Sequence, residues 1–229
     1  MRFKLWINAV LLALASTALQ AQSEESWDGL VEIKPKRLDV VQLLPGADFS
    51  GYSKVMLDPT EVAFRKDWLR DANQSHGPSR RITEANASEI LDAARSNFAD
   101  VFVAAFSEAG YSVVDAPAED VLRISTAVVN IDINAPLPDS AVGRVVTFVA
   151  DAGQATLIME ARDSQTNALL GRVADRREAR HPGGQVTRVS NRADFRALFR
   201  EWAKICVRGL EELKAHSPVP SDLKPGQKL

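Results

Sequence analysis

Residues 121–133 read VLRISTAVVNIDI, and the first eight of them alternate between two faces. Leu122, Ile124, Thr126 and Val128 share a mostly apolar face, and the residues between them, Arg123 and Ser125 among these, form a mostly polar one. A period of two is typical of a strand that is buried on one side of an antiparallel sheet. The stretch therefore predicts a long, half-buried antiparallel strand.

Further strand-like segments lie on both sides of this one. Residues 163–167 (DSQTN) have turn chemistry, and Asn167 tolerates a positive φ, so the segments around them predict a hairpin. Pro136 and Pro138 end the strand predicted at residues 121–133. The expected strands are residues 52–57, 111–114, 142–149, 155–163 and 169–176.

Two segments show the three- and four-residue spacing of amphipathic helices. The first is 86–109, where Phe98, Phe102 and Phe106 fall on one face and either Thr83 or Asn86 supplies the N-cap oxygen. The second is 194–214, with Phe199, Trp202 and Cys206 among its apolar residues.

Two helices on one face of a mostly antiparallel sheet would bury every apolar stripe described above. We therefore predict one two-layer α+β domain over residues 45–215. Residues 22–44 are expected to form an extended lead-in that is partly docked on the domain, and residues 216–229, with three prolines, a disordered tail. Residues 60–83 are expected to form a long connection.

The first residues have the pattern of a secretory signal peptide over residues 1–21, with a basic start, an apolar core and small residues before the cleavage point. Cleavage after Ala21 is favoured over cleavage after Ala18. A retained anchor is the alternative, but the apolar run is short for a bilayer and Asn8 interrupts it. No cysteine lies near the cleavage point and no later segment predicts a transmembrane span, so we expect a periplasmic or secreted protein.

Composition and motifs argue against several functions. The formal net charge of −2 gives no basic excess for nucleic acid, and the single cysteine, Cys206, excludes an internal disulfide and is expected to be buried. His76, His181 and His216 lie in expected loops or tail, and Asp132, Asp151 and Asp163 at strand ends or turns, without a catalytic or nucleotide motif. We expect no enzyme activity, cofactor or metal site.

Partner binding has a few candidate residues. One group is in the long connection, namely Trp68, Arg80 and Arg81; the other is the charged segment with Arg172, Arg176, Arg177 and Arg180. Trp68 has the alternative of packing at the edge of the core. The charged segment has the alternative of a solvated strand edge that charge protects from aggregation. The two groups would form one anion-binding patch only if the fold brings them together.

The chain resembles the bacterial family known as domain of unknown function 3313. The resemblance covers roughly residues 38–213. It rests on residues 45–52 (PGADFSGY), 55–62 (VMLDPTEV), 118–123 (AEDVLR), 160–170 (EARDSQTNALL) and the pair Trp202-Ala203. The resemblance implies an envelope protein and transfers no catalytic residue. Many members look like lipoproteins, and the missing acylated cysteine separates this chain from them.

Three functions follow as hypotheses. The first is a non-enzymatic module that contacts another envelope protein or envelope component. The second is a small-ligand or lipid carrier with a cavity between the sheet and the helices. The third, with least support, is a hydrolase. The sequence does not determine the oligomeric state.

Overall fold

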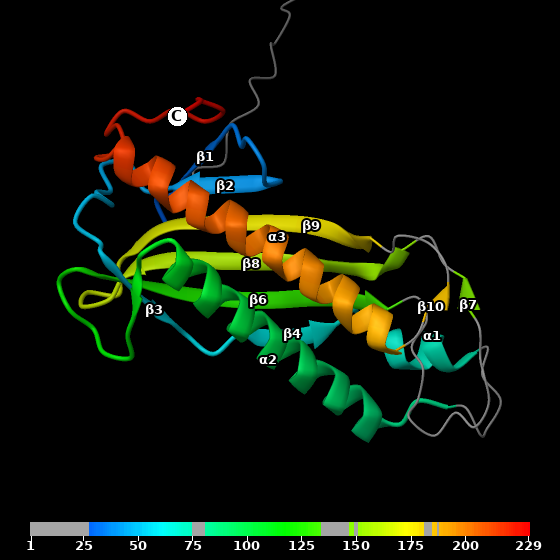
Figure 1. Cartoon of the computed structure of the whole chain (residues 1–229). Helices are drawn as coiled ribbons and strands as arrows, with labels where there is room; N and C mark the ends of the chain where they lie inside the picture. Colours follow the sequence, from blue (N-terminus) through cyan, green and yellow to red (C-terminus); the bar gives the residue numbers. More distant parts are fainter. Residues whose placement is uncertain (1–27, 75–80, 134–146, 149–150, 181–184, 187) are drawn as a thin grey trace, which may run out of the picture.

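Two long helices cover one face of a twisted sheet, and no helix of the described residues lies on the opposite face (Figure 1). The computed structural model describes residues 28–74, 81–133, 147–148, 151–180, 185–186 and 188–229. The predicted leader with Ala21 and most of the predicted strand 142–149 lie outside these residues. None of the helices in the described part has the length and apolarity needed to cross a membrane.

Three long antiparallel strands form the centre of the sheet: β6 (Val121–Ile133), β8 (Asp151–Asp163) and β9 (Leu169–Arg180). On β6 the alternating residues predicted to face the core are buried. The hairpin between β8 and β9 is confirmed, because Asp163 accepts a hydrogen bond from the Thr166 amide over 2.7 Å and Asn167 has a φ of 60°.

The sheet order is β1-β2-β9-β8-β6-β3-β5, with β4 also paired to β6. On the β6 side, the short strands β3 (Lys54–Leu57), β4 (Glu61–Phe64) and β5 (Ser112–Val113) pair in parallel. On the β9 side, β2 (Val40–Leu43) and β1 (Val31–Ile33) continue the antiparallel order. The pairs β6–β8 and β8–β9 give the sheet its mostly antiparallel character. A separate pair joins β7 (Thr147–Phe148) to β10 (Gln185–Val186).

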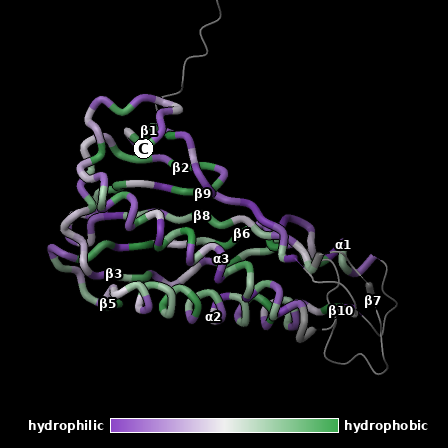
Figure 2. The backbone as a smooth tube through the Cα atoms, turned by 45° about the horizontal axis from the view of Figure 1, so that its top comes forward, coloured by the Kyte–Doolittle hydropathy of each residue, from purple (hydrophilic) through white to green (hydrophobic). Residues whose placement is uncertain are grey.

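The helices are α1 (Trp68–Gln74), α2 (Glu84–Glu108) and α3 (Arg188–Ala215). The two residues proposed for the α2 cap act together: the Asn86 amide donates to the Thr83 side chain, and the Asn86 side chain accepts from the Thr83 amide. Figure 2 shows hydrophobic and hydrophilic positions alternating along α2 and α3, as amphipathic helices require.

The main core lies between these two helices and the sheet. Phe98 and Phe102 stack at 4.0 Å on α2, and the ring of Phe98 meets that of Phe199 on α3 edge-on at 5.3 Å. Trp202 is fully buried beside them. The α+β two-layer prediction is thus confirmed, with both expected helix faces buried against one side of the sheet.

Two segments that we expected to be irregular form regular structure. The lead-in contains β1 and β2, because the outer backbone groups of β9 would be unpaired without residues 40–43, which bond to them. The long connection at 60–83 contains β4 and α1, whose apolar side chains pack into a small second core. The second expected helix also begins earlier than predicted, at Arg188 and not at residue 194.

The prediction of a disordered tail is wrong. Val219 and Leu223 are buried, the Val219 amide donates to the carbonyl of Ala47, and the Gly226 amide donates to that of Glu32. Its own apolar side chains and backbone partners from the N-terminal part of the chain thus fix this segment, although its sequence shows no helical or strand periodicity. Figure 1 shows it lying beside β1 and β2.

Candidate ligand cavity between helix α3 and the sheet

A cavity of about 150 Å³ lies between α3 and the β2-β9-β8 part of the sheet. The sheet contributes Ile124, Met159 and Val173 to its wall, and the helix contributes Ile205 and Leu210. Mostly apolar concave sites of this kind are the usual binding sites for small molecules. The cavity is therefore the first place to look for function.

A glycine of α3 creates part of this space. Ile205, Gly209 and Leu213 line the cavity at helical spacing. A side chain at Gly209 would start in open space, since no atom lies within 4 Å of an ideal Cβ there. The missing side chain therefore leaves room inside the apolar stripe of the helix.

The rim of the cavity is charged. We define the strap as residues 34–38 and the rim as Lys34, Lys36 and Arg37 of the strap with Glu212 and His216 of α3. Lys36 Nζ lies 3.1 Å from one Glu212 carboxylate oxygen, and Arg37 Nη1 lies 3.0 Å from the other. Hydrogen bonds from Lys36 and Arg37 lower the pKa of Glu212.

Cys206 lies in the wall of the cavity and is buried, as predicted. Burial raises the pKa of its thiol to about 12, and the nearby Asp175 carboxylate acts in the same direction. The thiol is therefore protonated at neutral pH and behaves as a small apolar side chain.

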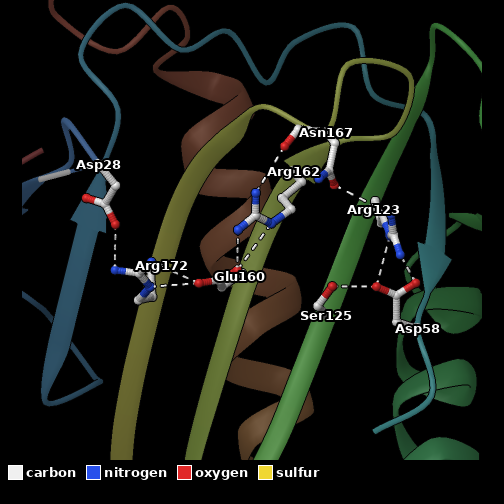
Figure 3. Close-up of polar contacts among 8 residues, drawn as sticks. All are labelled: Asp28, Asp58, Arg123, Ser125, Glu160, Arg162, Asn167 and Arg172. Carbon is white, nitrogen blue, oxygen red and sulfur yellow. Dashed lines mark hydrogen bonds and ion pairs between the residues drawn. The ribbon is translucent and has the colours of Figure 1, made fainter.

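Arg172, the first of the predicted partner-binding arginines, lies in an ion-pair network on the open face, the sheet face opposite α2 and α3 (Figure 3). It contacts Asp28 at 2.8 Å and Glu160 at 2.9 Å, and Glu160 also pairs with Arg162 at 2.7 Å. Burial raises the pKa of Glu160, but the hydrogen bonds of both arginines outweigh it and lower that pKa overall.

A second group on the same face joins β6 to the end of β3. Arg123 pairs with Asp58 at 2.9 Å, and the Ser125 hydroxyl also donates to that carboxylate. Figure 3 shows both groups in front of the helix, on strands that neighbour each other. The charges of the open face are thus largely satisfied within the sheet.

The other arginines of β9 lie beyond its last pair with β2, at Ala174. Arg177 contacts Asp175 and Glu201 and donates to the carbonyl of Arg37. Arg176 donates to Gln154 over 2.6 Å, and Arg180 is exposed. These contacts favour the alternative from the sequence analysis, in which charged side chains protect the exposed edge of β9, over a partner-binding patch.

The candidates from the long connection do not join this segment. Trp68 is buried and its ring stacks on Phe64 at 3.8 Å, so it packs in the second core and offers no surface to a partner. Arg80 lies outside the described residues. Arg81 is exposed just before α2, and no contact given for the described residues links it to the arginines of β9.

Two of the acids considered for catalysis have partners that explain them as structural residues. Asp132 pairs with Arg65 at 2.7 Å, and Asp163 accepts a hydrogen bond from the Tyr52 hydroxyl over 2.9 Å. His216 is exposed; His76, His181 and the Asp151 side chain lie outside the description. Within the described residues, no group of three histidine, cysteine or acidic side chains could hold a metal ion.

The family relationship follows from a match over residues 25–205 to the family described as "Protein of unknown function (DUF3313)". The chain belongs to the DUF3313 family. The match includes the strap and most of the cavity wall, so the candidate site lies largely inside the family domain. A comparison of this DUF3313 protein with curated proteins finds no match.

Solved structures resemble the DUF3313 protein only distantly. The PelC dodecamer from Paraburkholderia phytofirmans is 13% identical, with 72% of this chain and 96% of that chain covered and a TM-score of 0.35. Protein XCC0632 from Xanthomonas campestris is 10% identical over 82% and 96%, with a TM-score of 0.41. A neuraminyllactose-binding hemagglutinin homolog from Helicobacter pylori is 12% identical over 76% and 92%, with a TM-score of 0.35. These similarities support no conclusion about function.

The sequence analysis missed the residues that shape the cavity of this DUF3313 protein. Gly209 was one sign that could have been used, because a glycine in the middle of a helical pattern destabilises the helix and usually has a packing or functional role. The basic residues Lys34, Lys36 and Arg37 gave another, but they fell in the presumed lead-in. Glu212 gave no signal, since an acid on an amphipathic helix is ordinary.

Proposed function

We propose that this DUF3313 protein is an exported, non-enzymatic binding protein of the bacterial envelope. It takes the apolar part of a small molecule into the cavity between α3 and the sheet. The observation that supports this most is the open space beside the half-buried Gly209, in the mostly apolar wall of the cavity.

Two physical arguments support a binding role. A glycine inside a helix costs about 1 kcal/mol relative to alanine, and protein cores normally fill their space to crystal-like density. A fold that only needed to be stable would gain from a side chain at this position. A space of about 150 Å³ is large enough for a ligand the size of benzene.

Contact with another envelope protein, the first hypothesis from the sequence, has weaker support. The arginines that the sequence offers for it are partly engaged: Arg172 with Asp28 and Glu160, and Arg177 with Asp175 and Glu201. Trp68 is buried.

The cavity can be tested by isothermal titration calorimetry of the purified protein with 1-octanol, a neutral probe with an alkyl chain. We expect the wild-type protein to bind it and Gly209→Phe to lose the binding, because the ring would fill the space. Val103→Phe places the same ring on the exposed side of α2 and is the matched control. Equal binding by wild type and Gly209→Phe, or none by the wild type, would refute the proposal.

The location can be tested separately by cell fractionation and N-terminal sequencing. We expect the protein in the periplasmic fraction with Gln22 as its first residue. An intact leader on cytosolic protein would contradict the export part of the proposal and leave the cavity part standing.

A further inference from the structure

The rim of the cavity already holds a carboxylate between two cations. Lys36 and Arg37 each bind a different oxygen of Glu212, at 3.1 and 3.0 Å. This is how a basic pair recognises the head group of a carboxylic acid. Glu212 therefore marks a carboxylate-binding position at the entrance of an apolar cavity.

The backbone of the strap has contacts that do not involve Glu212. The Arg37 carbonyl accepts a hydrogen bond from Arg177 Nη2 over 2.6 Å, and the Lys34 amide donates to the Gln227 carbonyl over 2.8 Å. These contacts hold the backbone that carries Lys36 and Arg37, which lowers the entropic cost of binding an anion there.

The contact with Glu212 is easy to exchange. The side chains of Lys36, Arg37 and Glu212 are 54%, 41% and 35% exposed, and ion pairs in such settings add little to stability. A ligand carboxylate that replaces that of Glu212 would restore the same contacts while its tail enters the cavity.

The charge balance of the rim also favours an anion. Three cations, Lys34, Lys36 and Arg37, line the cavity near one acid, Glu212. The guanidinium of Arg172 lies on the open face, where it is paired with Asp28 and Glu160. The rim thus carries an excess of positive charge that one bound carboxylate would reduce.

The position of Glu212 links the head-group site to the cavity. Glu212 follows Gly209 by three residues on α3, so the two lie on the same side of the helix, about 5–6 Å apart. A carboxylate in place of that of Glu212 would have its alkyl chain directed to the space at Gly209.

We propose that the ligand is an anionic amphiphile, a carboxylate on a medium-length alkyl chain. Its head group binds Lys36 and Arg37 by displacing Glu212. This inference rests on the proposed function, because it assigns the chemistry of the molecule that the cavity holds.

The test compares octanoate with 1-octanol, which has the same chain length and no charge, by calorimetry on the full exported protein below the micellar range. We expect octanoate to bind about tenfold more tightly. The double variant Lys36→Gln/Arg37→Gln should lower the affinity for octanoate to that for 1-octanol. Glu212→Gln should raise the affinity for octanoate several-fold. Neither change should alter the affinity for 1-octanol.

Arg208→Gln removes an exposed charge from α3 outside the rim and is the control, with no expected effect on either probe. If both probes bind equally and the rim variants have no effect, the head-group inference is wrong and the cavity remains. If neither probe binds, the proposed function fails as well.

Discussion

The indole Nε1 of Trp202 donates a hydrogen bond to Asp175 Oδ2 over 2.7 Å inside the core. The Asp175 carboxylate also accepts from the Asp39 amide over 3.0 Å and pairs with Arg177. One buried acid thus joins α3, β9 and the segment that enters β2. This junction lies beside Cys206 and holds the helix that forms one wall of the cavity.

Asp175→Ala should lower the free energy of unfolding by about 3 kcal/mol, because it leaves Arg177 without its buried partner and the Trp202 N–H without an acceptor. Urea unfolding followed by tryptophan fluorescence measures the change. Glu178→Ala, an exposed acid on the same strand, should change it by less than about 0.5 kcal/mol. Equal stability of the two variants would contradict this account of the junction.

Glu160 should make stability depend on acid pH. Its pKa in the fold lies below its ordinary value of 4.5. Its contribution is therefore complete above pH 4.5 and is lost as the pH falls through the lower folded value. Glu160→Gln should cost about 1 kcal/mol at pH 7, and the gap to wild type should narrow below pH 4. Urea midpoints at pH 7, 5 and 3 test this, and a constant gap would count against the network in Figure 3.

Cys206 should resist alkylation in the folded protein. At pH 8.5 a thiol with a pKa of about 12 has a thiolate fraction on the order of a thousand times smaller than an ordinary cysteine has. Mass spectrometry after iodoacetamide treatment should find modification only in guanidinium. Rapid labelling of the native protein would show that the wall of the cavity is open at this residue.

Gly209→Ala should raise the free energy of unfolding by about 1 kcal/mol, since it removes a glycine from a helix without creating a clash. Gly171→Ala is the matched control in the opposite direction: its Cβ would lie 3.0 Å from the Leu43 side chain and 3.1 Å from the Gln42 carbonyl oxygen. Thermal unfolding of both variants separates the two cases. Destabilisation by Gly209→Ala would mean that the space is already filled.

Leu223→Ala should lower the free energy of unfolding by about 2–3 kcal/mol, because Leu223 is buried against the main core. Lys224→Ala, the exposed neighbour, should have almost no effect. Chemical denaturation measures both. Identical curves for wild type and Leu223→Ala would restore the prediction of a disordered tail.

The candidate site could be predicted only in part. The second hypothesis from the sequence already placed a carrier cavity between the sheet and the helices. The helix stripe with Cys206 and Leu210 was correctly assigned to the interior. The arginines of β9 attracted attention because they are dense in sequence, but the fold separates Arg172 on the open face from Arg177, which pairs with Glu201 of α3.

The sequence by itself determined the two layers. The alternation in residues 121–133 and the helical spacing of Phe98, Phe102 and Phe106 are local patterns, and burying them leaves few arrangements other than helices on one face of a sheet. The hairpin turn at Asn167 was determined in the same way, by residues within a few positions of each other.

Only the tertiary structure decided the edges of the sheet and the rim of the cavity. Lys36 and Glu212 are 176 residues apart in the sequence, and the C-terminal tail contacts β1, which lies near the other end of the chain. Such contacts depend on which backbone groups and apolar surfaces remain unpaired after the core has formed. That is a property of the whole fold, so no local sequence pattern in residues 34–38 or 217–229 predicts these contacts.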